Sequence, residues 1–302
     1  MIRFGLHTGQ HQVSFAELRD LWRDAASWGF DACYLFDHIV PLYSEVEAFL
    51  PEEALHPEGP CLEGITALAA LARSVPEVGV GLMVAGVGYR SAGYLAHAVA
   101  TIAQAAPGRI EIGVGAGWFE PEYQIMGLPF PPPRARLDAL ERALETLTAS
   151  LENVHPAPRL WVAGIGERRT IPLAARYADS WNAMYLTPEE YGRKVEVLTA
   201  AAEATGRDPH DIERSIALRA FCARRRSDAT QALEAWASAR GRNSHRVGER
   251  SLVGTPGDCA EQLSRYQEVG ATHCAVMAHP PYDRSGLELL AAECFPMLRR
   301  AP

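Results

Sequence analysis

Short apolar runs alternate along the chain with longer segments that carry apolar residues at helical spacing. The short runs are rich in β-branched and aromatic residues and end at glycine, proline or polar residues, which predicts strands. Helices are predicted between them. The predicted strands span residues 2–7, 32–36, 78–84, 109–115, 159–164, 180–184, 214–222 and 272–278.

This alternation also predicts the fold class. Eight strand–helix units in 302 residues fit a parallel sheet that closes on itself, with the helices outside. No linker rich in glycine, serine or proline divides the chain, so two doubly wound sheets fit less well. We therefore expect a single (β/α)8 TIM barrel domain over residues 1–302.

Several helix starts are marked by their own residues. Ser14 with Glu17, and Thr187 with Glu190, fit the capping box, in which each side chain bonds a backbone amide left free at the helix end. Pro256 follows a threonine and suits the first helical position, where a missing N–H costs nothing. A later segment carries one leucine stripe and so predicts a helix with one buried face, through Leu137, Leu140, Leu144, Leu147 and Leu151.

Two stretches do not fit the alternation and are predicted as insertions after the second and seventh strands. Residues 37–61 hold several prolines and glutamates, and a connection of this length is usually functional or mobile. Residues 240–250 are basic and polar. They suit either a solvated excursion or a clamp for an anionic ligand.

Charge and composition exclude several classes of protein. Lys and Arg number 29 against 37 Asp and Glu, a formal charge of -8, which disfavours nucleic-acid binding. No apolar stretch is long enough for a membrane helix, and no leader peptide is evident, so we expect a cytoplasmic protein without membrane contact. The six cysteines are scattered and form no CxxC pair, which indicates reduced thiols.

In a TIM barrel the reactive residues lie at the carboxyl ends of the strands. The positions that follow the predicted strands therefore form the candidate site. They include histidines, a carboxylate and glycine-rich turns. These positions are His7, Asp37, His38, Met83, Val84, 115–120, 164–168, Asn182, Met184 and His279.

Two glycine-rich turns need separate interpretation. Gly113, Gly115 and Gly117 do not have the GxGxxG spacing of a dinucleotide-binding turn and lie too deep in the chain for one, so close backbone approach to a flat ligand fits better. The turn 163–169 opens a helix with small residues and two arginines. It suits a phosphate site on free amide groups, or an ordinary strand-to-helix turn.

Asp37 beside His38 allows three hypotheses: a metal pair, an acid–base couple or a structural histidine. A metal needs three or four convergent ligands, and the chain has no HExxH or comparable cluster, so we expect no metal. A histidine at the barrel mouth suits acid–base duty. The catalytic and the structural hypotheses both remain at this point.

Four blocks of sequence occur in an order that is typical of one family. They are FDH at 36–38, VGVGLMVAGVGYR at 78–90, a long block at 108–144 that contains GWFEPEY and GLPFPPPRARL, and WVAGIGERRTIPLAARYADSWN at 161–182. Together they resemble the luciferase-like family of flavin- and deazaflavin-dependent oxidoreductases. The combination of GWFEPEY with GLPFPPPRARL is specific, whereas each glycine turn alone is not.

The resemblance implies roles for individual residues. His38 looks like the catalytic residue at the cofactor ring, and the bond between Met83 and Val84 corresponds to a non-proline cis peptide behind the ring. Family members commonly have histidine or asparagine and then proline after the position of Arg90, where this chain has Ser91 and Ala92, so we assign Arg90 only a structural role. The cofactor-binding residues implied are Asp37, Met83, Val84, Gly164, Ile165, Gly166, Glu167 and Arg168.

The family divides between members that use F420, a hydride-carrying deazaflavin, and members that use reduced FMN to activate oxygen. The Asp-His pair with GWFEPEY looks more like the F420 type, and Arg168, Arg169 and residues 240–250 offer cations for its acidic tail. We expect hydride transfer to or from a small organic substrate. Residues proposed on the substrate side are His7, Glu120, Tyr123 and His279.

Three alternatives remain open from sequence. The first is a monooxygenase that receives FMNH2 from a partner reductase. The second is a barrel that binds flavin without turnover, and the third is a metal-dependent barrel hydrolase. The family resemblance also implies a homodimer, whereas the substrate is not readable from the sequence.

Overall fold

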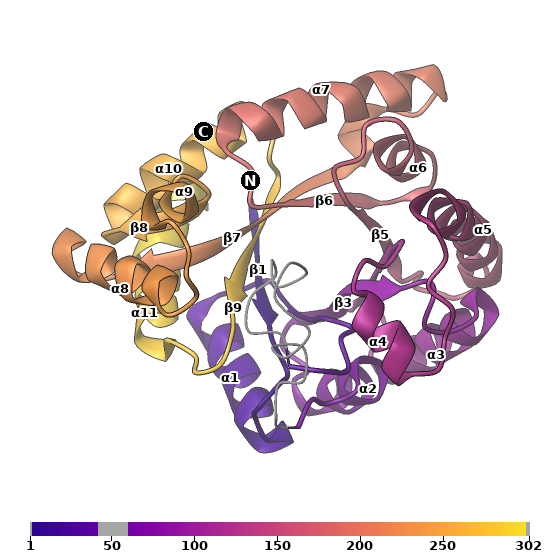
Figure 1. Ribbon diagram of the computed structural model, residues 1–302, viewed down its shortest axis with the longest axis horizontal. Coiled ribbons are helices and arrows are strands. Elements are labelled where there is room, and N and C mark those ends of the chain that lie inside the picture. Colours follow the sequence, from indigo (N-terminus) through magenta and orange to yellow (C-terminus); the bar gives the residue numbers. More distant parts are fainter. Residues whose placement is uncertain (1, 42–59, 300–302) are drawn as a thin grey trace.

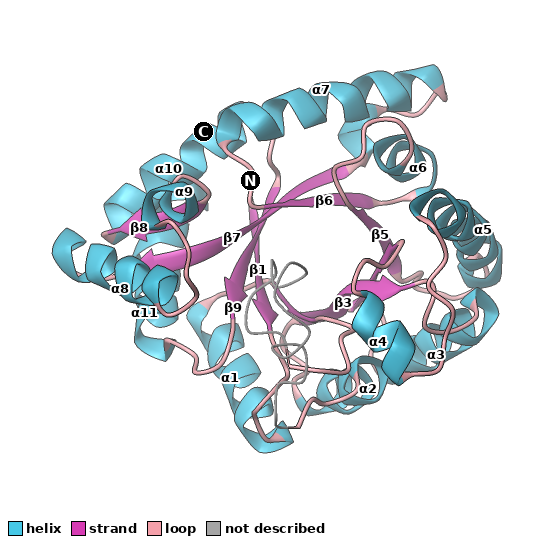
Figure 2. Ribbon diagram, viewed as in Figure 1, coloured by secondary structure: helices cyan, strands magenta, loops and turns pink. Residues whose placement is uncertain are grey.

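Parallel strands close into a ring at the centre of the molecule, and helices surround it (Figures 1 and 2). The computed structural model describes residues 2–41 and 60–299. Neighbouring strands pair in the order β6-β5-β4-β3-β2-β1-β9-β7, and pairing of β6 with β7 closes the ring. The barrel strands are β1 (Arg3–Thr8), β2 (Ala32–Leu35), β3 (Gly79–Gly86), β4 (Ile110–Gly115), β5 (Arg159–Ala163), β6 (Ser180–Met184), β7 (Glu213–Cys222) and β9 (His273–Ala278).

All eight predicted strands are present, and the predicted TIM barrel is confirmed. One strand was missed. β8 (Ser251–Gly254) lies outside the ring and pairs with the far end of β7, from Arg219 to Cys222. Its four residues are too few to stand out from the polar segment before them, and they follow that segment without a break in the pattern.

Helices follow the strands around the outside of the ring (Figure 2). Short helical turns complete the connections at Pro209–Asp211 and Leu290–Cys294. The helices are α1 (Phe15–Trp28), α2 (Gly64–Ser74), α3 (Ala92–Ala105), α4 (Glu120–Ile125), α5 (Pro133–Leu151), α6 (Thr170–Tyr177), α7 (Pro188–Ala204), α8 (Arg226–Ser238), α9 (Ser244–Gly248), α10 (Pro256–Glu268), α11 (Arg284–Leu289) and α12 (Phe295–Arg299). Within the described ranges, none of them is both long and apolar enough to cross a membrane.

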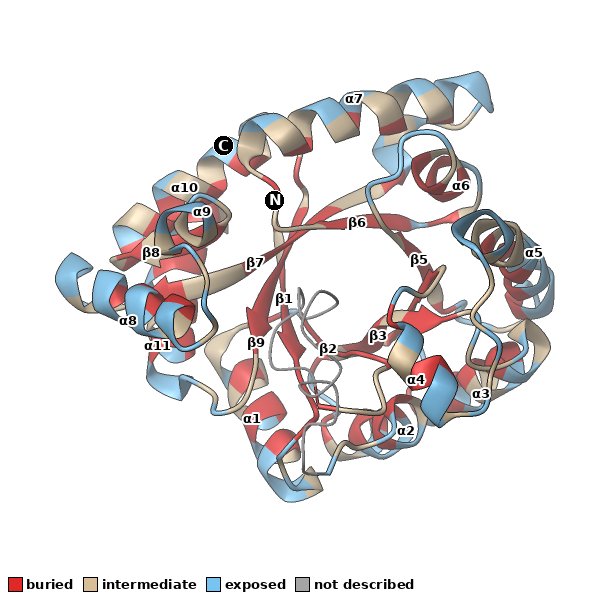
Figure 3. Ribbon diagram, viewed as in Figure 1, coloured by how far each residue is buried: buried red, intermediate tan, exposed pale blue. Residues whose placement is uncertain are grey.

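The predicted helix starts are confirmed. Both halves of the capping box form at Ser14 in α1 and at Thr187 in α7, and Thr255 adds a third before Pro256 in α10. The leucine stripe of α5 faces the barrel: four of the leucines are buried and Leu137 is partly buried against the core. The amphipathic helices therefore cover the outer face of the sheet, whose strands are buried along most of their length (Figure 3).

Charged residues fill the amino-terminal end of the barrel. Arg3 on β1 donates to Glu111 on β4 at 2.6 Å and to Glu213 on β7 at 2.9 Å. Arg159 on β5 lies 3.4 Å from Glu213. Both carboxylates are nearly buried, and their charges are met by guanidinium groups from other strands. This end is tied across the ring by ion pairs, which leaves the opposite end for a binding site.

The two predicted insertions have different outcomes. Of the stretch 37–61, residues 42–59 lie outside the described part of the chain. At its end, Cys61 forms an antiparallel bridge with His11. The basic stretch 240–250 forms a turn and the short helix α9, and it leads from α8 into β8.

Candidate active site

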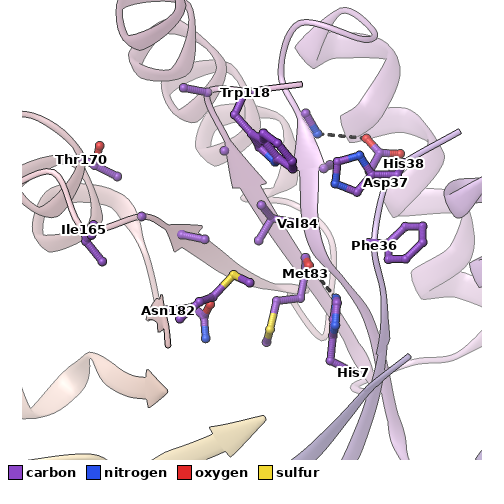
Figure 4. A pocket seen from close by; sticks show the side chains of 18 of the residues that line it. His7, Phe36, Asp37, His38, Met83, Val84, Trp118, Ile165, Thr170 and Asn182 are labelled. Atoms are coloured by element: carbon purple, nitrogen blue, oxygen red, sulfur yellow. Dashed lines mark hydrogen bonds between the residues drawn. The ribbon is translucent and has the colours of Figure 1, made fainter. Parts of the chain in front are cut away.

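A cavity of about 500 Å³ opens at the carboxyl ends of the barrel strands (Figure 4). Nearly every strand end singled out from sequence contributes to it, from β1 through β9. Residues from distant parts of the chain thus meet in one chamber. The predicted residues that line it are His7, Asp37, His38, Met83, Val84, Gly164, Ile165, Asn182, Met184 and His279.

His38 is held by a buried carboxylate that the sequence analysis did not select. Nδ1 of His38 lies 2.7 Å from Oε2 of Glu122, which is fully buried in α4. Trp118 packs edge-on to the imidazole, with ring centroids 5.7 Å apart. Because a carboxylate can only accept, the proton of this hydrogen bond belongs to Nδ1, and Nε2 is the nitrogen left for an occupant of the cavity.

Glu122 receives further hydrogen bonds from loops on either side. Tyr89 donates its hydroxyl to Oε2 at 2.5 Å, and the amide of Ile39 donates to Oε1 at 2.7 Å. Burial alone would raise the pKa of Glu122, but the hydrogen bonds from His38, Tyr89 and Ile39 outweigh it and hold the pKa below its usual value. The carboxylate is therefore ionised at neutral pH and fixes the orientation of the imidazole.

Two neighbours of Glu122 were proposed on the substrate side and do not line the cavity. Glu120 is exposed at the start of α4. Tyr123 is buried, where its ring packs against Tyr89 and Phe130, each with centroids 4.9 Å apart. The motif GWFEPEY was correctly singled out, but the turn of α4 brings its second glutamate inward and leaves the first in solvent. His7 and His279, the other two substrate-side candidates, do line the cavity.

Asp37 is committed to the protein framework. Its carboxylate forms a two-point ion pair with Arg90, at 2.6 and 2.9 Å, and accepts from the Gly86 amide at 2.9 Å. Burial raises the pKa of Asp37, and the bonds from Arg90 and Gly86 oppose that rise. Arg90, which also reaches Glu63 at 3.2 Å, joins the loop after β2 to the end of β3. The structural role expected of Arg90 is thus seen as a support directly beneath the site.

The end of β3 carries the irregularity that the resemblance implied. The peptide bond between Met83 and Val84 is cis, and the register with β4 shifts between Leu82 and Ala85. The Met83 carbonyl accepts a hydrogen bond from Nε2 of His7 at 2.8 Å. Figure 4 shows Val84 projecting into the cavity between Trp118 and Met83.

The glycine run of β4 makes room for protein side chains. A Cβ at Gly113 or Gly115 would meet the side chain of Val84, and one at Gly117 would meet the hydroxyl of Tyr123. Gly117 also has a positive φ of 77°. These glycines therefore make room for Val84 and Tyr123, and Gly115 and Gly117 also line the cavity. Their close approach to a flat ligand stays a prediction.

The turn between β5 and α6 borders the cavity and carries amides that lack a partner in the described part of the chain. Gly164, with φ of 130°, and Ile165 line the chamber with Thr170 at the start of α6. Within the described residues, the amides from Ile165 to Thr170 have no hydrogen-bond partner. A Cβ at Gly166 would lie 3.0 Å from Oγ1 of Thr170. The turn is a narrow cradle of donors at a helix start, which fits a phosphate group.

The charged residues of this turn face elsewhere. Gly166, Glu167 and Arg168 are exposed and are not part of the cavity lining. Glu167 pairs with Lys194 at 2.7 Å, and Arg169 pairs with Asp138 and Glu141, each at 3.0 Å. Arg169 is therefore already neutralised by carboxylates of α5. Direct cofactor contacts by Gly166, Glu167 and Arg168 stay predictions.

Two stacked histidines border the cavity. His279, which follows β9, stacks on His11 with ring centroids 5.9 Å apart. Burial, followed by the charges of His279, His38 and Arg240, lowers the pKa of His11 to about 4. Arg240 thus brings the basic stretch 240–250 near this edge, while Arg250 pairs with Glu190 at 2.8 Å. The role of this stretch as a clamp stays a prediction.

Comparison with known proteins agrees with this architecture. Residues 1–250 match the family described as luciferase-like monooxygenase. A phthiodiolone/phenolphthiodiolone dimycocerosates ketoreductase of Mycobacterium bovis is 31% identical over 237 residues, which cover 70% of this chain and 58% of that protein. The chain therefore spans less than two thirds of that relative's length. An F420-dependent glucose-6-phosphate dehydrogenase of Intrasporangium calvum is 25% identical, with 99% of each chain covered.

Solved structures share the fold at lower identity. An F420-dependent secondary alcohol dehydrogenase in complex with an F420-acetone adduct superposes with a TM-score of 0.81 at 17% identity, covering 97% of this chain and 98% of that one. The FMN-bound oxygenating constituent of 3,6-diketocamphane monooxygenase from Pseudomonas putida has a TM-score of 0.75 at 18% identity, covering 98% of each chain. The family suggested by the sequence motifs is thereby confirmed: this chain belongs to the luciferase-like monooxygenase family.

Proposed function

We propose that this protein is an F420-dependent oxidoreductase that transfers hydride between the deazaflavin ring and a carbonyl or alcohol carbon of a small organic substrate. The observation that carries the proposal is that three features meet at one cavity. They are the His38–Glu122 pair, the apolar ridge formed by Met83 and Val84 at the end of β3, and the amide cradle, which is the turn from Gly164 to Thr170. An acid–base group, an apolar support and an anion site are what a phosphate-bearing redox ring requires.

The residues present fit such a cofactor. The free amides from Ile165 to Thr170 would hold its phosphate, and Met83 with Val84 would support one face of its ring. When bound, the cofactor supplies the hydride chemistry. Asp37 and Arg90 keep the end of β3 in place beneath it.

The protein's own side chains would transfer a proton to or from the substrate and keep water away from it. Glu122 accepts the hydrogen bond from Nδ1 of His38 and so keeps a proton on that nitrogen, and its negative charge balances the ring when both nitrogens are protonated. Nε2 of His38 would give a proton to the substrate oxygen as a carbonyl is reduced, and would take it back in the reverse direction. Trp118, which is 41% exposed at the cavity edge, would cover the substrate from solvent.

The relatives support this choice of cofactor and reaction. Those that match along this sequence are a ketoreductase and F420-dependent dehydrogenases by name. A carbonyl and an alcohol are the two redox states of one substrate pair, which suits hydride transfer assisted by one acid–base group. A homodimer, expected from the resemblance, stays a prediction.

A second candidate is an FMNH2-dependent monooxygenase served by a reductase. It is favoured by the family's description and by an FMN-bound structure of the same fold. The amide cradle would serve the phosphate of FMN equally well. A barrel that binds flavin without turnover remains the non-enzymatic alternative.

Anaerobic fluorescence titration of the purified protein with F420, FMN and FMNH2 tests the proposal. We expect F420 to bind at least about tenfold more tightly than either flavin, a difference of about 1.4 kcal/mol. Absorbance of reduced F420 would then decay when ketones are added. Tighter binding of FMNH2, followed by oxygen-dependent product formation, would instead establish the monooxygenase. F420 binding with no turnover across a panel of ketones and alcohols would favour the binding protein.

A further inference from the structure

Asn182 places an unpaired acceptor at the floor of the cavity. The residue is fully buried on β6 and lines the chamber, and its Oδ1 has no hydrogen-bond partner among the described residues. Its amide nitrogen donates to Ser215 at 2.8 Å. Figure 4 shows the side chain between the Ile165–Thr170 turn and Met83. A buried carbonyl without a donor is costly, so this atom is a place where an occupant would gain a bond.

A chain of buried hydrogen bonds fixes which end of the Asn182 amide faces the cavity. It begins at Glu111, which pairs with Arg3 and can only accept, so the hydroxyl of Tyr34 donates to it at 3.0 Å. The oxygen of Tyr34 is then left to accept from Nε2 of His273, 3.4 Å away. This assigns the single ring proton of His273 to Nε2.

The remaining bonds follow from that assignment. Burial lowers the pKa of His273 to about 3, so the ring is neutral and its Nδ1 accepts from Ser215 at 2.8 Å. With its proton used, the oxygen of Ser215 accepts from the Asn182 amide nitrogen. The amide cannot turn over without breaking this sequence of donors and acceptors. Its carbonyl is therefore locked toward the cavity.

The place of Asn182 indicates which part of a ligand it meets. Its backbone carbonyl accepts from the amide of Gly164 at 3.0 Å, so the residue adjoins the amide cradle. The ridge of Met83 and Val84, on β3, lies across the barrel from β6 (Figure 4). Consider a molecule whose phosphate lies in the cradle and whose ring lies on the ridge. The chain that joins its ring to its phosphate would pass over Asn182 at the floor of the cavity.

We propose that Oδ1 of Asn182 accepts a hydrogen bond from a hydroxyl of the polyol chain between the ring and the phosphate of the cofactor. This inference rests on the proposed function and adds a cofactor-recognition residue to it. Asn182 then distinguishes a ring that carries a polyol phosphate from the bare ring, because only the former satisfies the buried acceptor.

The test compares two probes on the whole protein. One is F420, and the other is the same deazaflavin ring with a methyl group in place of the polyol chain. Asn182→Leu should weaken F420 binding about 5- to 10-fold, the usual loss for one buried hydrogen bond, and leave the affinity for the bare ring within about twofold. Asn182→Ala, which adds no bulk, gives the same pattern if leucine disturbs folding. Both affinities are measured by fluorescence titration.

Ser180→Ala is the matched control. Ser180 is equally buried and lies two residues earlier on β6, but its hydroxyl bonds Glu213 at the opposite end of the barrel and does not line the cavity. Its variant should bind both probes like the unmodified protein. Ser215→Ala removes the group that holds the amide and should weaken F420 binding less than Asn182→Leu does.

Two outcomes would overturn the inference: unchanged F420 affinity in both Asn182 variants, or equal losses for F420 and the bare ring, which would place the donor on the ring. The unmodified protein reports separately on the proposed function. If it binds FMN and not F420, the proposed cofactor is wrong, and the same comparison is made with FMN and lumiflavin, which differ in the same chain.

Discussion

His38 and Glu122 form a pair in which each residue depends on the other. The carboxylate has no exposed surface and accepts from His38, Tyr89 and a backbone amide, so it has little freedom to move. An imidazole held in this way presents one defined nitrogen to the cavity. A carboxylate behind a histidine fixes both ring orientation and proton position, as it does in other enzyme sites.

Replacing His38 and Glu122 separately and together measures how far the effect of one on kcat depends on the other. His38→Ala should lower kcat about 10²-fold or more, the usual range for a lost acid–base group, while F420 affinity changes less. Glu122→Gln should lower kcat to a smaller extent. The double variant should be no slower than His38→Ala alone, because Glu122 acts through His38. Steady-state kinetics of all three variants checks this.

Tyr89→Phe serves as the control, because it removes one donor to the same carboxylate and leaves the bond to His38. It should change kcat least of all. Unchanged turnover in His38→Ala would remove this residue from the mechanism, and losses that add in the double variant would give Glu122 a role of its own.

At the scale of elements, the turn between β5 and α6 is the part of the cavity that we propose for a phosphate. Gly164 needs its positive φ, and its carbonyl accepts from the Trp181 indole at 2.9 Å, so β6 holds the start of the turn. Gly166 has no positive φ and lies in the exposed middle of the turn, but an added Cβ would lie 3.0 Å from Oγ1 of Thr170. The charge of a glutamate there should be felt by a phosphate on the neighbouring amides, and Gly166→Gln, which brings the same crowding without the charge, separates the two effects.

Gly166→Glu should weaken F420 binding at least about tenfold through like-charge repulsion. The bare deazaflavin ring, which has no phosphate, should bind as before. Gly93→Glu is the control, because it adds the same charge at the start of another helix, α3, where a Cβ meets nothing within 4 Å. Titration with both probes measures the effect. Equal F420 affinity in the two variants would locate the phosphate elsewhere.

The strands and the helix starts were predictable because they depend on local pattern. Runs of β-branched residues, and capping residues such as Ser14 and Thr187, act within a few positions of one another. β8 was missed because it is short and lies outside the barrel, where it pairs with β7. The cavity-lining strand ends followed from the fold class, since a barrel gathers its carboxyl ends at one mouth.

The partners within the site were not predictable in this way. Glu122 reaches His38 across 84 positions of sequence, and Arg90 reaches Asp37 across 53. Nothing in the spacing of GWFEPEY says which glutamate turns inward. That choice depends on how the short α4 packs over the loop that follows β2, a long-range contact that no local pattern encodes.

At the scale of the whole molecule, the two ends of the barrel have different tasks. The carboxyl end holds the cavity, and the amino end holds the ion pairs of Arg3 with Glu111 and Glu213. These pairs join β1, β4 and β7, which are far apart in sequence and lie around the ring. Residues at the amino end of a TIM barrel usually contribute to stability, whereas the chemistry takes place at the carboxyl end.

Arg3→Met should therefore destabilise the protein by about 2–4 kcal/mol, because it leaves two nearly buried carboxylates with less countercharge. Burial raises the pKa of Glu213, but the charged partners Arg3 and Arg159 oppose that rise, and the pKa lies below its usual value. In the unmodified protein, that stabilisation is present above about pH 4.5 and is lost as the pH falls through the lowered pKa. The deficit of the variant should thus be largest at neutral pH and shrink in acid.

Urea unfolding between pH 7 and pH 3 measures this deficit. Arg265→Met, which breaks an exposed pair with Glu261, is the control and should cost under about 0.5 kcal/mol. A deficit no larger than the control's, or one that grows in acid, would show that these ion pairs do not hold the barrel together.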